Sequence, residues 1–237
     1  VGADPQGLPV GQPLRLANRH GLIAGATGTG KTVTLQRLIE TFSDAGVAVF
    51  AADVKGDLCG LGAAGTPQGK VAERIASMPW LNHQPKAYPV TLWDVHGQSG
   101  HPLRTTLSEM GPLLLGALLE LTDSQQAALY AAFKVADREG LLLLDLKDLK
   151  ALLAHLKNQP EVLGEDSALF TATSSQALLR KLAGLEQQGA DALFGEPALQ
   201  LEDILHPDRD GRGRVHLLDA SRLVHEAPKV YATFLLW

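Results

Sequence analysis

The chain has 237 residues, of which 45% are hydrophobic and 20% charged, so it can bury a substantial core and is not a disordered chain. Its 21 Lys and Arg against 26 Asp and Glu give a net charge of −5, so any nucleic-acid contact must come from a local basic patch. A single cysteine, Cys59, excludes an internal disulfide framework, and no apolar run is long enough to span a bilayer; we therefore expect a cytoplasmic protein without a membrane partner.

The first part of the chain predicts a strand–helix–strand unit. A short apolar run at residues 21–24 predicts the first strand, and an apolar stripe at helical spacing predicts the helix, which Gly46 terminates. The stripe consists of Leu35, Leu38, Ile39 and Phe42. Three further strands are predicted where an apolar run is closed by an aspartate, at residues 47–52, 88–93 and 215–218. Because parallel strands need a crossover of this length, we predict an α/β fold with a parallel sheet.

A Leu- and Ala-rich block with helical spacing lies between the third and fourth runs. Thr122 and Gln125 predict a capping box at the start of one helix, and Gly140 predicts its end. Asp145 predicts the N-cap of a second helix, and a third is expected at about residues 175–188. We therefore divide the chain into residues 1–103, the N-terminal half of the core; 104–201, a helical insertion; and 202–237, a return to the core.

The two ends of the chain predict that the natural polypeptide is longer. The chain starts with Val1 rather than Met, and residues 228–237 begin like a helix with Pro at its first turn. That helix stops on Phe-Leu-Leu-Trp with neither a cap nor a polar tail. We therefore expect the α/β core to be incomplete at the C-terminus.

Residues 25–32, Gly-Ala-Thr-Gly-Thr-Gly-Lys-Thr, match the phosphate-loop pattern G-x-x-x-x-G-K-[ST] in full. The glycines let successive backbone N–H groups converge on one anion, and the following helix adds the positive end of its dipole. Lys31 can neutralise the β- and γ-phosphates, and the Thr32 hydroxyl can bind Mg²⁺. The motif specifies binding of a triphosphate but not its base. The candidate nucleotide-binding residues are Gly25, Ala26, Thr27, Gly28, Thr29, Gly30, Lys31, Thr32 and Val33.

Hydrolysis also needs acidic side chains near the phosphates, and aspartates follow several apolar runs. Asp53 opens Asp-Val-Lys-Gly-Asp after the strand that follows the phosphate-loop helix. Ligands gather at this end of a parallel strand, so Asp53, together with Lys31, is a candidate catalytic residue. A charged cluster in a solvated loop explains the sequence equally well. Asp94 and Asp219 are interpreted as strand ends. The histidines show no metal-ligand spacing, and residues 208–214, with three arginines, predict an exposed turn more than a calcium or phosphate site.

The phosphate loop, residues 53–58 and residues 101–104 together resemble HerA-like ATPases, a branch of the HerA/FtsK superfamily, and in particular its bacterial members described as a domain of unknown function. The similar stretches are residues 19–32, 53–58, 91–94, 101–104, 108–112 and 215–221. The resemblance implies a RecA-like core, ATP and Mg²⁺, hexameric rings and ATP-driven DNA translocation or helicase activity. It implies that Lys31 and Thr32 form the nucleotide-binding pair. It also places the acidic strand with the catalytic glutamate beyond Trp237.

Three functions remain open from the sequence. The first is an ATP-driven DNA motor domain of the HerA-like type, active at full length. The second is a nucleotide-binding or assembly module that does not hydrolyse ATP. A small-molecule kinase is the third, although no acceptor pocket or lid arginines are identified. The sequence contains no Asn-Lys-x-Asp stretch, which disfavours a GTPase.

Overall fold

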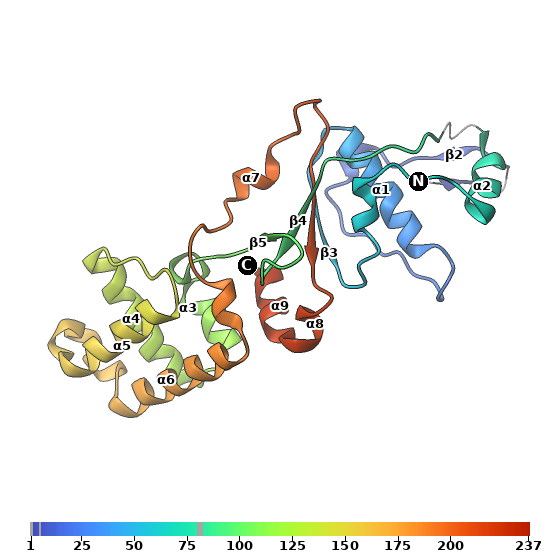
Figure 1. Cartoon of the computed structure of the whole chain (residues 1–237). Coiled ribbons are helices and arrows are strands. Elements are labelled where there is room, and N and C mark those ends of the chain that lie inside the picture. The colour runs from blue at the N-terminus through green and yellow to red at the C-terminus, as the bar shows by residue number, and fades with distance from the viewer. Residues whose placement is uncertain (1, 5, 80–82) are drawn as a thin grey trace. The chain divides into compact units, whose positions relative to one another are not determined.

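The computed structural model describes residues 2–4, 6–79 and 83–237 (Figure 1). The chain divides into two compact units. The first comprises Val1–Leu92 and Leu201–Leu218, and the second comprises Trp93–Gln200 and Asp219–Trp237. The chain therefore leaves the first unit after Leu92, returns to it for residues 201–218, and leaves it again at Asp219.

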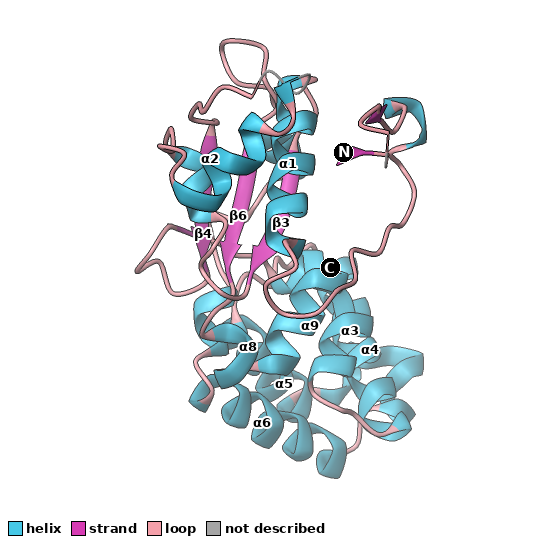
Figure 2. Ribbon diagram, turned by 90° about the vertical axis from the view of Figure 1, so that its right-hand side faces the viewer, coloured by secondary structure: helices cyan, strands magenta, loops and turns pink. Residues whose placement is uncertain are grey.

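A four-stranded parallel sheet has the strand order β3-β6-β4-β5. Its strands are β3 (Val49–Asp53), β4 (Val90–Asp94), β5 (His101–Pro102) and β6 (Val215–Asp219). The arrows of β3, β4 and β6 point the same way in Figure 2. These three strands are the predicted ones at residues 47–52, 88–93 and 215–218, so the prediction of an α/β fold with a parallel sheet is confirmed.

The strand predicted at residues 21–24 is wrong. Residues 21–26 have no regular secondary structure, and the side chain of Leu22 is 90% exposed. The run offers only two large apolar side chains between glycines, which lose more backbone entropy on ordering than other residues. The N-terminal segment instead forms a two-stranded antiparallel pair, β1 (Gly2–Ala3) and β2 (Pro9–Val10).

The first unit packs its longest helix, α1 (Lys31–Asp44), against the sheet. Ile39 of the predicted stripe is fully buried, whereas Leu35 is partly exposed. Alternate residues of a strand face the same side of a sheet. Alternate residues of β3 and β6 pack with Ile39 in one hydrophobic core. The core cluster consists of Ile39, Leu58, Leu61, Tyr88, Val215 and Leu217, with Val49, Ala51 and Val90 packed against it. Gly46 follows the helix with φ of 79°, so the predicted terminator is confirmed.

Two shorter helices complete the regular structure of the first unit: α2 (Gly69–Ala76) and α7 (Leu201–Leu205). The second unit is mainly helical, with α3 (Leu107–Leu118), α4 (Asp123–Glu139), α5 (Leu146–Asn158), α6 (Ala172–Gln187), α8 (Leu223–Glu226) and α9 (Pro228–Leu236). Short 3-10 helices lie at Leu14–Leu16, Cys59–Gly62, Pro160–Leu169 and Ala190–Leu193. Fully buried leucines from α3 to α6 form the core of the second unit.

The helix ends of the second unit follow the local signals in the sequence. The capping box of Thr122 and Gln125 is present, and Gly140 ends α4 in the left-handed conformation. Asp145 caps α5: its Oδ1 accepts hydrogen bonds from the backbone N–H of Lys147 at 2.7 Å and of Asp148 at 3.2 Å. The predicted N-cap is confirmed.

Replacing Asp145 by alanine should lower the free energy of unfolding by about 1 kcal/mol, because two N-terminal N–H groups of α5 lose their acceptor. Thermal unfolding followed by circular dichroism measures the effect. Asp137→Ala, at an exposed position on α4, is the control and should change the melting temperature little. Equal melting temperatures of the Asp145→Ala variant and the wild type would contradict the assigned cap.

Candidate functional site

The phosphate-loop sequence forms a tight loop that leads directly into α1. Residues 27–30 are turns and bends, and Lys31 is the first residue of the helix. Gly28 and Gly30 have φ angles of 81° and 94°, in the left-handed region that favours glycine. A Cβ atom on Gly25 would lie 2.5 Å from Oγ1 of Thr29, so a larger residue would collide within the loop. The three glycines therefore have a conformational reason to be there, although residues 21–24, directly before the loop, do not form a strand.

Two polar side chains of the loop fold back onto one carbonyl group. The Lys31 ammonium donates a hydrogen bond to the carbonyl oxygen of Ala26 at 2.8 Å. The Thr29 hydroxyl donates to the same oxygen, also at 2.8 Å. The positive charge of Lys31 is thus held over the loop that it belongs to, beside the N-terminus of α1.

The loop after β3 brings a carboxylate to the start of α1. The Thr32 hydroxyl donates a hydrogen bond to Oδ2 of Asp57 at 3.2 Å. The side-chain amide of Gln36, one turn further along α1, donates to the carbonyl oxygen of Asp57 at 3.0 Å. The sequence does not mark Asp57 as a site residue. It is visible there only as the end of Asp-Val-Lys-Gly-Asp, within the stretch 53–58 that resembles HerA-like ATPases.

Asp53 organises this loop from its base. Only 5% of the residue is exposed. Its Oδ1 accepts hydrogen bonds from the N–H groups of Lys55, Gly56 and Asp57 at 3.3, 2.8 and 3.2 Å, and its Oδ2 accepts one from Leu58 at 2.9 Å. The carboxylate therefore fixes residues 54–58, and its catalytic role stays a prediction.

Thr32 and Asp57 together offer hydroxyl and carboxylate oxygens, the ligand type that Mg²⁺ prefers. Among the residues that the structure describes, no group of three or more His, Cys, Asp or Glu side chains could hold a metal ion. Mg²⁺ is usually bound by one or two protein oxygens together with substrate phosphates and water. The residues at the start of α1 therefore fit a metal that arrives with a nucleotide.

Asp94 and Asp219 close their strands by the same kind of turn as Asp53. Asp94 accepts backbone hydrogen bonds from His96, Gln98 and Ser99 at 2.7–2.9 Å, and Asp219 accepts from the N–H and hydroxyl of Ser221. Burial would raise the pKa of Asp94, but the hydrogen bonds from Ser99, His96 and Gln98 outweigh it and hold the pKa below its ordinary value. The interpretation of Asp94 and Asp219 as strand ends agrees with these hydrogen bonds.

Within the predicted stretch 208–214, a turn is present at residues 209–211, which are exposed. The N–H of Gly211 donates to the carbonyl oxygen of Asp208 at 2.9 Å, and Gly211 has φ of 82°. The arginines that follow are engaged within the first unit: Arg212 pairs with Asp210 at 2.6 Å, and Arg214 pairs with Asp208 at 2.6 Å.

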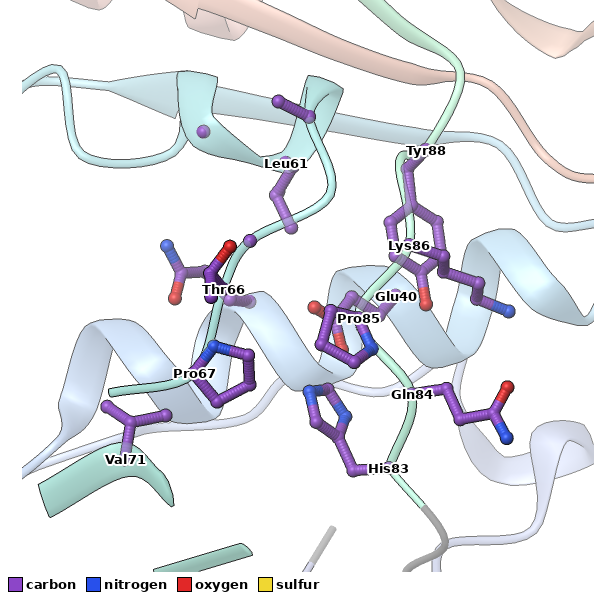
Figure 3. Close-up of a pocket in the computed structure, with 14 residues that line it drawn as sticks. Glu40, Leu61, Thr66, Pro67, Val71, His83, Gln84, Pro85, Lys86 and Tyr88 are labelled. Atoms are coloured by element: carbon purple, nitrogen blue, oxygen red, sulfur yellow. The ribbon is translucent and has the colours of Figure 1, made fainter. Parts of the chain in front are cut away.

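A cavity of about 220 Å³ lies along α1, beyond Gln36 (Figure 3). Figure 3 shows Pro67 and Pro85 beside it, with Glu40 on the helix behind. At its side Tyr88 is buried, and its hydroxyl donates to Oδ2 of Asp44 at 3.3 Å. Burial, and then the negative charges of Glu40 and Asp44, raise the pKa of Tyr88 above its ordinary value of 10.0.

This shift makes the stability of the first unit sensitive to alkaline pH. A raised pKa favours the neutral phenol in the folded state, so its contribution is complete below pH 10 and is lost as the pH rises through the folded-state pKa. Between pH 9 and 11, the melting temperature of the wild type should therefore fall more steeply than that of Tyr88→Phe. Parallel curves for the two proteins would contradict the shift.

These features define an α/β protein with a parallel sheet and a glycine-rich loop that opens a helix. The family model described as "Helicase HerA-like C-terminal" matches residues 1–237, and the chain belongs to this family. The resemblance inferred from the sequence is thereby confirmed. The comparison with curated proteins finds no match to this chain. Among residues 2–4, 6–79 and 83–237, no helix is long and apolar enough to cross a membrane.

Proposed function

We propose that the chain binds ATP with Mg²⁺ at residues 25–33, as the nucleotide-binding part of an ATP-driven DNA translocase or helicase of the HerA-like type. The observation that carries the proposal is the loop itself: its sequence is complete, Gly28 and Gly30 adopt φ angles that favour glycine, and it opens directly into α1. Family membership supports the motor function, because the matched family is described as helicase-like.

The residues of the loop have separate roles in this proposal. The N–H groups at the start of α1 have no partner within the first turn of a helix and suit an anion. Lys31 exchanges the Ala26 carbonyl oxygen for the β- and γ-phosphates and neutralises their charge. Thr32 offers its hydroxyl oxygen to Mg²⁺, which when bound supplies positive charge that stabilises the transferring phosphoryl group.

A RecA-like core, ring assembly as a hexamer and contact with DNA complete this proposal, and they are carried over from the family. With a net charge of −5, the protein would concentrate basic side chains at a ring interior rather than over its whole surface. DNA binding through phosphate contacts weakens as the salt concentration rises.

A second candidate function is nucleotide binding without hydrolysis, as a binding or assembly module. The four backbone hydrogen bonds to the Asp53 carboxylate favour it, because a side chain so engaged is poorly placed to orient an attacking water. The two candidates predict the same affinity for ATP and differ in turnover.

Calorimetric titration of the 237-residue chain with ATP and Mg²⁺ tests the proposal, and phosphate release measured on the natural protein, rather than on this chain alone, separates the two candidates. We expect saturable binding of one ATP per chain. Binding without phosphate release supports the second candidate, and phosphate release supports the first. Absence of binding at millimolar ATP would overturn both.

A further inference from the structure

We propose that Asp57 positions the Mg²⁺ of the bound nucleotide by holding the Thr32 hydroxyl and the water shell of the metal. This inference rests on the proposed binding of Mg·ATP and assigns a role to a residue outside the phosphate loop. The geometry that suggests it is the 3.2 Å hydrogen bond from Thr32 Oγ1 to Asp57 Oδ2.

The direction of this hydrogen bond prepares Thr32 for a cation. Ionised aspartate only accepts hydrogen bonds, so the hydroxyl proton points to Asp57 and the oxygen lone pairs remain available for a metal. Mg²⁺ binds oxygen ligands at about 2.0–2.1 Å and retains several of its waters. A carboxylate in contact with the hydroxyl therefore lies within one water molecule of any Mg²⁺ that the hydroxyl binds.

The backbone around Asp57 is held in place from two sides. From the sheet, Asp53 accepts the N–H groups of Asp57 and of its neighbours, and Leu58 is buried with only 2% exposed. From α1, Gln36 donates to the Asp57 carbonyl oxygen. The Asp57 residue itself is exposed, so solvent and a ligand can reach it. A fixed backbone with an accessible carboxylate suits a metal-positioning residue, since little ordering is left to occur on binding.

Charge, rather than shape, should dominate the effect of Asp57. Asparagine keeps the size of the side chain and one acceptor oxygen for Thr32, but it removes the negative charge that attracts Mg²⁺. The same charge repels the phosphates when no metal is present. Asp57→Asn should therefore weaken the binding of ATP with Mg²⁺ and leave the binding of free ATP unchanged or slightly stronger.

The test measures the dissociation constant of ATP by calorimetry, with excess Mg²⁺ and with EDTA, for each protein. In the wild type, Mg²⁺ should tighten ATP binding; in Asp57→Asn we expect this gain to shrink by about tenfold, which corresponds to about 1.4 kcal/mol. Asp57→Glu, which keeps the charge, should recover part of the gain. Glu73→Gln, at an exposed position on α2, is the control and should retain all of it. Thermal unfolding of each variant shows that the fold is kept.

Each outcome decides between the two proposals. An unchanged gain from Mg²⁺ in Asp57→Asn, in a variant that unfolds like the wild type, overturns the role of Asp57 and leaves ATP binding intact. Equal weakening with Mg²⁺ and with EDTA also overturns it, because the residue would then support the loop rather than the metal. A wild-type chain that binds no ATP overturns the proposed function together with this inference.

Discussion

Replacing Lys31 by alanine is expected to weaken ATP binding by roughly 10- to 100-fold. A hydrogen bond to a charged group contributes about 1.5–3 kcal/mol, and the lysine is the one charged donor within residues 25–32. Because its ammonium contacts the loop through the Ala26 carbonyl oxygen, it already lies beside the proposed phosphate position. Calorimetric titration with ATP, with and without Mg²⁺, measures the loss.

The metal dependence separates Lys31 from Asp57. Lys31 acts on the phosphates directly, so its removal should weaken ATP binding both with Mg²⁺ and with EDTA. Lys70→Ala, at an exposed position on α2, is the matched control for the loss of one positive charge and should bind ATP like the wild type. Equal affinities of Lys31→Ala and Lys70→Ala would remove the phosphate loop from the proposed mechanism.

Local chemistry explains which parts of the fold the sequence could predict. Capping residues such as Thr122 and Asp145 act within four residues of themselves, so their patterns are legible without knowledge of the tertiary structure. The aspartates that close β3, β4 and β6 also act on residues close to them in the sequence. Each turns the chain by accepting N–H groups from the next few residues, as Asp53 and Asp94 show.

Pairing over long distances explains what the sequence missed. A strand at residues 21–24 would need a neighbouring strand to accept its hydrogen bonds, and no short apolar run can specify that partner. The contact between Thr32 and Asp57 joins residues 25 positions apart, and it depends on the turn that Asp53 imposes. The glycine pattern of residues 25–32 was visible because the loop folds on itself; its carboxylate partner was not.

Gly213→Ala should destabilise the first unit by about 3 kcal/mol, the upper end of the usual cost of overpacking, because the turn before β6 packs directly on the backbone that follows α1. A Cβ atom on Gly213 would lie 1.9 Å from the carbonyl oxygen of Val47 and 2.2 Å from its carbonyl carbon. A flexible side chain could move away, but the Val47 backbone leads into β3, so relief of the collision must displace the turn or the strand.

The same turn carries two hydrogen bonds that such a displacement would stretch. The N–H of Gly213 donates to the Ser43 carbonyl oxygen at 2.7 Å, and the buried Ser43 hydroxyl donates to the Gly213 carbonyl oxygen at 2.6 Å. Urea unfolding followed by circular dichroism measures the loss, with Gly60→Ala as control, since a Cβ atom there meets no described atom within 4 Å. If Gly213→Ala and Gly60→Ala unfold at the same urea concentration, the turn before β6 does not pack on the backbone that follows α1 as closely as the structure has it. In that case β3, and the loop after it that carries Asp53 and Asp57, would be held less firmly than the hydrogen bonds of the two aspartates imply.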